Sequence, residues 1–187
     1  MGLDQPTRGL PFQISLLAGL LLVGTGCASS NHSPLPTVEQ VDLDRFMGDW
    51  YVVGLIPNRI EKDAYESVES YAMRPDGKIA ITYEYRKGGF KGPKKTLNMV
   101  ARVGDGGQGA EWRVRPFWPL SLKYLVTDLA DDYRYTVVAH PSRNYAWIMA
   151  REKTLNDADW ESVLGRLEGQ GFELDRIVRV PQIPPTG

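Results

Sequence analysis

Residue types that support covalent or metal chemistry are scarce in this 187-residue chain. It has one cysteine, Cys27, so it can form neither an intramolecular disulfide nor a thiolate metal cluster. Its two histidines, His32 and His140, leave few candidates for a histidine base. With 22 basic and 23 acidic residues the net charge is −1, which excludes a chain-wide basic surface for nucleic acid. The sequence therefore predicts no metal centre, no cofactor and no nucleic-acid partner.

A short apolar run precedes the part of the chain expected to fold. Residues 14–23 would cover, as a helix, only roughly half of a ~30 Å hydrocarbon core. The run follows Arg8 and is followed by small residues at 24–26, an order typical of a secretory signal. Residues 1–26 are therefore predicted to be a signal peptide rather than a membrane span.

Cys27 stands directly after these small residues. The arrangement resembles a bacterial lipoprotein signal, which implies cleavage before Cys27 and lipidation of its thiol and new amino group. Ala28, rather than Asp, follows the cysteine and favours anchoring to the outer membrane of a Gram-negative envelope. Several acyl chains would anchor the protein stably. The alternative is an ordinary secretory signal that leaves Cys27 as a free thiol.

The segment after the cysteine is rich in small polar residues and has two prolines. Residues 27–40 are therefore predicted to be a lipidated N-terminus and a flexible tether. His32 lies in this tether, so it is not expected to be catalytic. The folded domain is expected over residues 41–181, with residues 182–187 as a loose tail.

Short β-rich runs separated by turn residues fill most of this domain. Eight strands are expected, over residues 50–56, 67–73, 79–85, 96–103, 111–115, 122–129, 133–139 and 145–150. Connections of hairpin length, with no crossover helix, predict an all-β antiparallel arrangement. Eight sequential strands can close into an up-and-down β-barrel with room for one small ligand. A β-sandwich with a solid core is the structural alternative.

One helix is expected after the last of these strands. Asn156 is a plausible N-cap, and Trp160, Val163, Leu164 and Leu167 have the spacing of one apolar helix face. This face would pack on the outside of the barrel. A ninth strand is expected over residues 172–180, and the chain from Pro181 onward is expected to be loose.

Three short motifs occur in order along this pattern. Gly48 and Trp50 form a Gly-x-Trp at the first strand, Asp131-Asp132-Tyr133 lies between the sixth and seventh strands, and Arg151 ends the eighth. Together they resemble the signatures of the lipocalin family, in particular the bacterial outer-membrane lipocalins related to apolipoprotein D. The resemblance covers residues 40–181. It implies a calyx with an external C-terminal helix, in which Gly48, Trp50, Asp132, Tyr133 and Arg151 are structural and Arg151 stacks on Trp50 at the closed end.

The parity of Trp50 and Arg151, together with the family register, predicts which side chains face the barrel interior. These candidate ligand-binding residues are Val52, Gly54, Tyr71, Met73, Ile81, Tyr83, Tyr85, Leu97, Met99, Trp112, Val114, Tyr145, Trp147 and Met149. They form an apolar, aromatic-rich wall suited to a chain-like ligand, although the same residues could form a solid core. Glu69 shares the inward parity and is expected at a wet rim, with head-group binding as the alternative.

Four loops, at residues 57–66, 86–95, 116–121 and 140–144, are expected to surround the open mouth. The second of these loops is strongly basic and the third exposes aromatic residues, a combination suited to an anionic lipid head group or a bilayer surface. The candidate head-group residues are Lys87, Lys91, Lys94, Lys95, Phe117 and Trp118. The alternative is that the basic loop is simply solvated.

These features favour a non-enzymatic lipoprotein that binds a fatty acid, lysophospholipid or similar lipid for storage or transport in the cell envelope. A structural or protein-binding lipoprotein with a filled barrel is an alternative. A lipid-modifying enzyme is less favoured, because there is no Gly-x-Ser-x-Gly motif and nothing in the spacing pairs His140 with Ser121 or Ser142. The sequence leaves a homodimer open.

Overall fold

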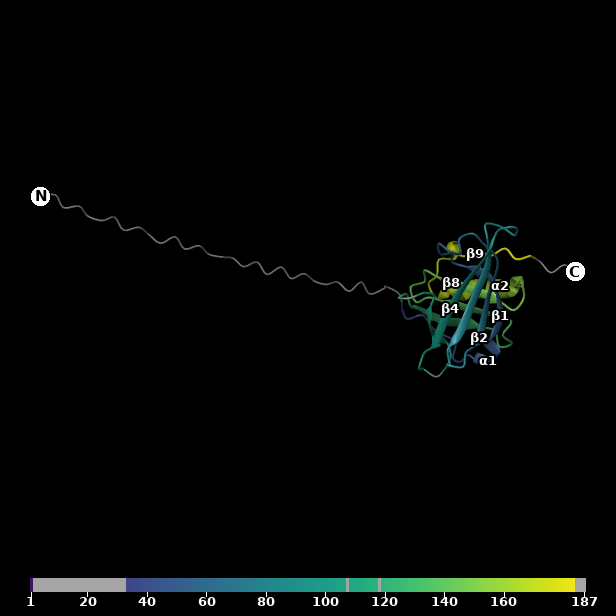
Figure 1. The fold of residues 1–187 in the computed structure, drawn as a ribbon, viewed down its shortest axis with the longest axis horizontal. Helices are drawn as coiled ribbons and strands as arrows, with labels where there is room; N and C mark the ends of the chain where they lie inside the picture. Colours follow the sequence, from purple (N-terminus) through teal and green to yellow (C-terminus); the bar gives the residue numbers. More distant parts are fainter. Residues whose placement is uncertain (2–32, 107, 118, 184–187) are drawn as a thin grey trace. The chain divides into compact units, whose positions relative to one another are not determined.

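The computed structural model describes Met1 and residues 33–106, 108–117 and 119–183. The expected signal peptide, the lipidation site Cys27, the mouth residue Trp118 and the last four residues of the tail lie outside the described residues. The described chain begins its secondary structure with a short helix, α1 (Leu43–Phe46), and continues with strands (Figure 1). The barrel strands are β1 (Gly48–Leu55), β2 (Ala64–Met73), β3 (Ile79–Lys87), β4 (Lys94–Val103), β5 (Glu111–Arg115), β6 (Leu122–Leu129), β7 (Tyr135–Ala139) and β8 (Ala146–Ala150).

The eight strands form a closed antiparallel barrel. Each strand from β1 to β8 pairs with the next along the chain, and β1 also pairs with β8, which closes the sheet. Burial alternates along the strands, as in β3, where Ile79, Ile81 and Tyr83 are buried and the residues between them are partly exposed. The predicted eight-stranded up-and-down barrel is therefore confirmed, and the sandwich alternative is wrong.

Helix α2 (Asp157–Gly169) covers part of the outer surface of this barrel (Figure 1). Asn156 is its N-cap, as expected, and accepts a hydrogen bond from the backbone N–H of Asp159 at 2.9 Å. Trp160, Val163 and Leu167 are buried with the outward-facing apolar residues of β7 and β8. Neither described helix has the length and apolar content needed to cross a membrane.

A β-bulge in β1 changes which side chains of this strand face inward. The register with β8 shifts between Val52 and Gly54, so Val52 and Leu55 join the interior cluster while Val53 joins the cluster under α2. A Cβ at Gly54 would lie 2.6 Å from the Trp160 side chain, which shows that this residue faces the helix. The expected inward direction of Gly54 is wrong, because strict alternation fails across the bulge.

Met73 also departs from the expected interior wall. It is the last residue of β2 and is 42% exposed, although its partner in β3, Ile79, is fully buried. Met73 has the same parity as the inward-facing residues of β2, but the strand has reached the end of the barrel at this residue. Met73 is therefore a surface residue at the closed end and not part of the cavity.

The segment before the barrel is bound to it rather than free. Leu35 is buried, the Val38 N–H donates to the Val126 carbonyl at 3.0 Å, and Arg143 donates to the Ser33 carbonyl at 2.7 Å. This corrects the expectation of a flexible tether for residues 33–40.

The chain after α2 also differs from the expected ninth strand over residues 172–180. It forms a turn of 3₁₀ helix, η1 (Leu174–Arg176), and a two-residue strand, β9 (Val178–Arg179), which pairs with β1. Beyond it, the Gln182 side-chain amide donates to the carbonyls of Val52 and Ser67 at 3.0 and 3.1 Å. The chain at Pro181 and Gln182 is therefore fastened to the barrel and not loose.

Candidate ligand-binding site

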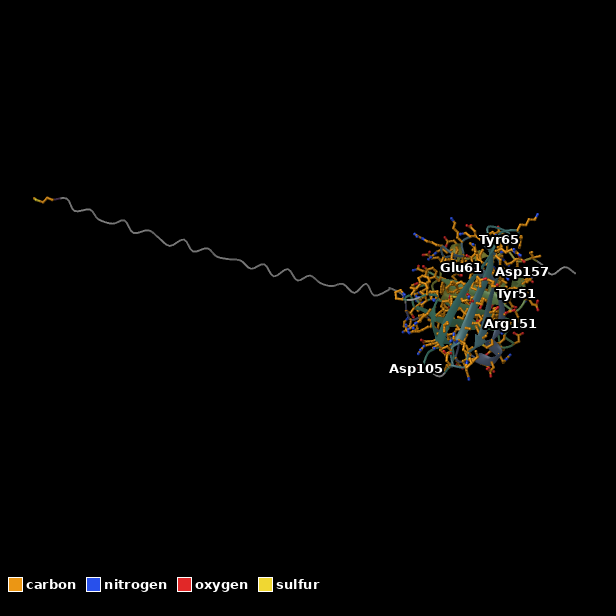
Figure 2. The ribbon with its side chains drawn as sticks, in the orientation of Figure 1. Tyr51, Glu61, Tyr65, Asp105, Arg151 and Asp157 are labelled. Carbon is orange, nitrogen blue, oxygen red and sulfur yellow. The ribbon has the colours of Figure 1, made fainter. Side chains whose placement is uncertain are left out.

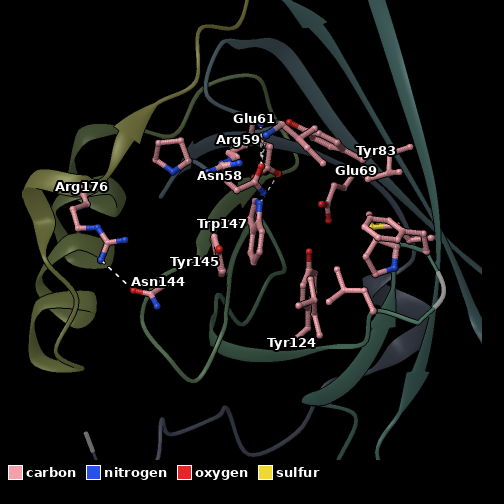
Figure 3. A pocket seen from close by; sticks show the side chains of 18 residues that line it. Asn58, Arg59, Glu61, Glu69, Tyr83, Tyr124, Asn144, Tyr145, Trp147 and Arg176 are labelled. Carbon is pink, nitrogen blue, oxygen red and sulfur yellow. Dashed lines mark hydrogen bonds between the residues drawn. The ribbon is translucent and has the colours of Figure 1, made fainter. Parts of the chain in front are cut away.

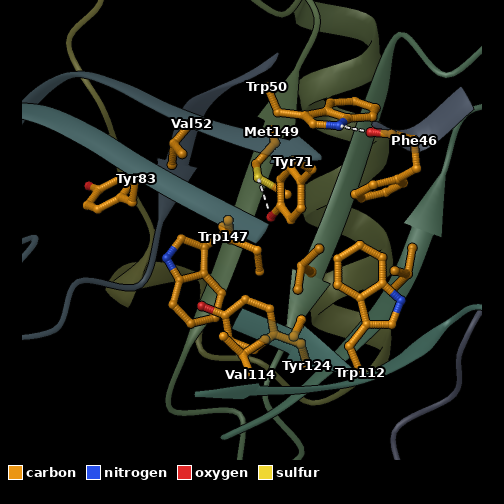
Figure 4. Close-up of a cluster of buried hydrophobic side chains, with 14 of the residues drawn as sticks. Phe46, Trp50, Val52, Tyr71, Tyr83, Trp112, Val114, Tyr124, Trp147 and Met149 are labelled. Atoms are coloured by element: carbon orange, nitrogen blue, oxygen red, sulfur yellow. Dashed lines mark hydrogen bonds between the residues drawn. The ribbon is translucent and has the colours of Figure 1, made fainter. Parts of the chain in front are cut away.

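One end of the barrel is closed by a cluster of aromatic side chains (Figure 4). The Phe46 ring, from α1, lies between Trp50, Tyr71 and Trp112, with ring centroids 5.0–5.4 Å away. The Trp50 indole N–H donates to the Phe46 carbonyl at 2.8 Å, so its polar atom is satisfied inside the cluster. These contacts leave no room for a ligand at this end of the barrel.

Arg151 covers the closed end from outside. Its guanidinium carbon lies 3.7 Å from the centroid of the Trp50 ring, and it donates to the carbonyls of Arg45, Phe46, Met47 and Asp49 at 2.7–3.2 Å. One planar cation thus satisfies four backbone carbonyls and stacks on an indole face. Gly48 adopts a φ of +93°, a conformation that favours glycine, immediately before the strand enters this cluster.

Tyr133 fastens α1 to the same end. Its hydroxyl accepts a hydrogen bond from the Asp42 N–H at 2.8 Å, and the Arg45 guanidinium lies 4.0 Å above its ring. Its neighbour Asp132 is exposed and accepts from the Arg134 backbone N–H, which supports the tight turn before β7. These motif residues hold the barrel base together.

The other end of the barrel contains a cavity of about 630 Å³ (Figure 3). This volume falls within the range of pockets that enclose small organic ligands. Figure 2 labels Glu61, which lines the cavity, and, lower in the view, Arg151, which covers the closed end. The lining residues are Pro57, Asn58, Arg59, Ile60, Glu61, Glu69, Tyr83, Leu97, Met99, Pro116, Phe117, Leu120, Leu122, Tyr124, Asn144, Tyr145, Trp147 and Arg176.

Glu61 is a buried carboxyl group in the cavity wall, contributed by the loop between β1 and β2. It is 7% exposed and accepts a hydrogen bond from the Trp147 indole N–H at 2.8 Å. The Asn58 amide donates to its other oxygen. Burial, with a smaller contribution from repulsion by Glu69, raises the pKa of Glu61 to about 7. Near neutral pH this group is therefore present in both charged and neutral forms.

Glu69, from β2, is a second buried carboxyl group in the same wall. It is 2% exposed, and the Tyr71 hydroxyl donates to one of its oxygens. Burial raises the pKa of Glu69 to about 7. The expectation of a wet rim position is wrong, because this residue lies well inside the barrel, between the closed-end cluster and the mouth.

The cations that line the cavity are arginines and not the expected lysines. Arg59 and Arg176 line the cavity, whereas none of Lys87, Lys91, Lys94 and Lys95 does so. Lys94 pairs with Glu84 at 3.0 Å on the outer face of the sheet. The loop between β3 and β4 turns outward, where Phe90 packs edge-on against Tyr65 at a centroid distance of 5.2 Å. The structure therefore does not bring the four lysines to the cavity.

Among the described residues, no histidine lines this cavity. His140 Nδ1 lies 2.8 Å from the Ser142 hydroxyl, but the two residues form a local turn and neither lines the cavity. Within the described part of the chain, no three His, Cys, Asp or Glu side chains are grouped to hold a metal ion. What the arrangement offers is an apolar volume with two buried carboxyl groups.

A family model described as a lipocalin-like domain matches residues 41–182. The chain belongs to the lipocalin family. The match spans α1, the barrel, α2 and β9 of this lipocalin.

Similar proteins share nearly the full length of this lipocalin. The protein named outer membrane lipoprotein Blc from Citrobacter freundii is 28% identical over 178 residues, covering 94% of this chain and 98% of that protein. The protein of the same name from Escherichia coli K12 is 27% identical over 179 residues, with the same coverage. Among solved structures, the cockroach allergen Per a 4 gives a TM-score of 0.62 at 19% identity, covering 83% of this chain and 97% of that one.

The interior residues expected from the sequence divide into two groups in this lipocalin. Tyr83, Leu97, Met99, Tyr145 and Trp147 line the cavity, as does Phe117 at its mouth. The others that face inward are packed in the interior cluster and do not line the cavity: Val52, Tyr71, Ile81, Tyr85, Trp112, Val114 and Met149. Most of the second group lies nearer the closed end than the first, but Tyr85 lies two residues beyond Tyr83 toward the open end of β3.

Several lining residues were not indicated by the sequence. Tyr124 has the inward parity of its strand, which could have identified it from the alternation around Leu122 and Val126. Glu61 and Arg59 lie in the loop between β1 and β2, and Arg176 ends the short 3₁₀ helix η1, so no strand periodicity predicts the direction of these side chains. The cavity of this lipocalin is thus more polar than its strand pattern suggests.

Proposed function

We propose that this lipocalin binds a lipid or another small hydrophobic ligand in its barrel cavity, without catalysing a reaction. The finer proposal is a fatty acid, lysophospholipid or similar lipid, held for storage or transport at the outer membrane of a bacterial envelope. The names of the relatives from Citrobacter and Escherichia, together with the lipoprotein-like signal before Cys27, support attachment to that membrane.

The observation that carries the proposal is the unfilled volume on the mouth side of the aromatic cluster. A barrel whose only role was structural would be more stable if side chains filled this space, because protein interiors are normally close-packed. Instead, the wall contains large apolar side chains such as Leu97, Met99 and Trp147 around about 630 Å³. Burial of an apolar chain there provides roughly 25 cal/mol per Å² before the cost of association.

A test can use the chain without its anchor. Every member of the two buried apolar clusters lies between Leu35 and Val180, so a protein of residues 28–187 keeps the complete barrel. Native mass spectrometry of this protein, purified from a bacterial host without detergent, should show an added mass that disappears after delipidation. The released ligand can then be identified by its mass.

A second measurement tests whether the ligand binds inside the barrel cavity. Leu97→Trp places bulk in the cavity wall and should weaken binding of an apolar fluorescent probe by about tenfold, because a filled site loses the contacts of the ligand. Val68→Trp, on the outward-facing side of β2, is the matched control and should leave binding unchanged. Binding that is equal in both variants, or a purified protein that takes up no lipid at all, would contradict the proposal.

A further inference from the structure

Two buried carboxyl groups face the cavity without a basic partner. Within the described residues, no salt bridge joins Glu61 or Glu69 to a lysine, arginine or histidine. A buried carboxylate is costly unless a cation or several hydrogen bonds compensate it. Glu61 has hydrogen bonds from Trp147 and Asn58, whereas the described residues supply Glu69 with one, from Tyr71. The second oxygen of Glu69 is thus available to a ligand.

Tyr124 provides an independent polar group at the same place. It is 5% exposed, and its hydroxyl makes no hydrogen bond to the part of the chain that the structure describes. Figure 3 shows this hydroxyl directed into the cavity, toward the Glu69 carboxyl group. Although the residue as a whole is buried, its hydroxyl oxygen is accessible from the cavity, so a ligand there can hydrogen-bond with it. A ligand that carries hydrogen-bond donors would satisfy both Tyr124 and Glu69.

Aromatic faces surround these oxygens. The rings of Tyr124 and Trp147 lie 4.9 Å apart, and Tyr83, whose hydroxyl donates to Ser67 at 3.2 Å, is on the opposite part of the wall. Aromatic faces attract ammonium groups through the negative charge density of the ring, and quaternary ammonium ligands are recognised in this way. Carboxylates and aromatic rings together repel an anionic head group and attract a cationic one.

We propose that this cavity prefers ligands whose polar group is an ammonium over free fatty acids, with the cation held by Glu69, Glu61 and Tyr124. The proposal rests on ligand binding in the barrel, and it narrows the ligand to amphiphiles with an amine or a quaternary ammonium. Because burial raises the pKa of both glutamates to about 7, they are largely ionised at pH 8 and would then bind a cation most strongly. Among the described residues that line the cavity, the basic ones are Arg59 and Arg176, and both lie toward the mouth.

The test compares three probes with the same ten-carbon chain: decyltrimethylammonium, decanoate and 1-decanol. In calorimetric titrations of residues 28–187 at pH 8, the ammonium should bind with at least roughly tenfold higher affinity than decanoate. The carboxylates attract the ammonium and repel the carboxylate of decanoate. Glu69→Gln and Glu61→Gln preserve the size of the side chain and remove its charge, and Glu61→Gln keeps one of the two hydrogen bonds that Glu61 accepts. Each should weaken binding of the ammonium several-fold more than binding of 1-decanol, which carries no charge.

Two further variants sharpen the comparison. Tyr124→Phe removes only the unpartnered hydroxyl and should weaken binding of a primary amine, decylammonium, more than that of the quaternary probe, which has no N–H to donate. Glu84→Gln, on the outer face of β3, is the matched control and should change none of the affinities. Circular dichroism of each variant establishes that the barrel has folded.

The outcomes separate this inference from the proposed function. If 1-decanol binds in the cavity but decanoate binds as tightly as the ammonium, or the glutamine variants keep full affinity for the ammonium, the inference is overturned and lipid binding stands. If none of the three probes binds, both the inference and the proposed function fail.

Discussion

The two ends of this barrel are built by the same strands, but one end is tightly packed and the other contains a cavity. Strand β2 contributes Tyr71 to the closed end and Glu69 to the cavity, and β8 likewise contributes Met149 and Trp147. At the closed end, rings pack against rings and Arg151 satisfies the backbone carbonyls. At the open end, Glu69 and Tyr124 keep polar atoms that the described chain does not satisfy. Position along the strand, more than residue type, thus separates the stable part of the interior from the part available to a ligand.

The strongest test of this difference removes a large side chain from each end. Trp50→Ala should lower the free energy of unfolding by about 3–5 kcal/mol, the usual cost of truncating a buried aromatic residue. Leu97→Ala, at the cavity wall, should cost less, because this partly exposed residue already borders empty space. Urea unfolding followed by far-ultraviolet circular dichroism measures both values. Equal losses, or an unchanged midpoint for Trp50→Ala, would contradict the structural assignment of the closed end.

Because of the two glutamates at the open end, we expect the free energy of unfolding to depend on pH. The pKa values of Glu61 and Glu69 rise from 4.5 to about 7 in the folded protein, so the folded state holds protons that the unfolded state releases. The free energy of unfolding should therefore fall as the pH rises from 5 to 8. The expected decrease is on the order of 3 kcal/mol for each group.

Glutamine variants isolate this effect from other titrating groups. Burial lowers the pKa of His140 and raises that of Asp128, and both groups add their own dependence on pH. The difference in unfolding free energy between the wild type and Glu61→Gln/Glu69→Gln should nevertheless change across pH 5–8, with the wild type losing stability faster. Parallel curves for the two proteins would mean that the carboxyl groups are solvated, as at an ordinary rim.

The fold could be predicted from the sequence because its signals are local. Turn residues bound runs of alternating apolar residues, and Asn156 begins a helix with a clear apolar face. Trp50 and Arg151, far apart in the chain, could be placed together only through the resemblance to a family. Residues of the interior were expected from strict alternation, which holds for β3 but fails for β1, where one extra residue at the bulge turns Gly54 outward.

The polar features of the site were less accessible to such reasoning. Alternation identifies an inward side chain but does not tell how far along the barrel it lies, so Glu69 was placed at a rim and Val114 and Met149 at a cavity. The loops have no period at all, and Glu61 and Arg59 reach the cavity through a turn capped by the Asn58 side chain. Depth and loop conformation are properties of the closed barrel, not of any one strand.

A change at the wall between the barrel and helix α2 should have a smaller effect. Gly54→Ala places a methyl group 2.6 Å from the Trp160 ring, so the helix must shift and the cost should be about 1–3 kcal/mol. Gly165→Ala is the matched control, because a Cβ there meets nothing within 4 Å and the residue lies inside the helix. It should stabilise the protein by roughly 0.5–1 kcal/mol. Thermal unfolding should show shifts of opposite sign, and a stabilised Gly54→Ala variant would contradict this packing.

The smallest expected effect distinguishes the cations of the mouth from those of the outer loop. Arg59→Gln and Arg176→Gln should change the affinity for decanoate by only about twofold to fivefold, since exposed charges contribute roughly 0–1 kcal/mol. The change should shrink at high salt, because screening acts over ~8–10 Å at moderate ionic strength. Replacement of Lys87 and Lys91 by glutamine should have no effect at either salt concentration, because neither lysine lines the cavity. If the lysine variants weaken binding as much as the arginine variants, the basic loop takes part in head-group recognition after all, and the division of the interior into a closed end and a cavity bounded by Arg59 and Arg176 is incomplete.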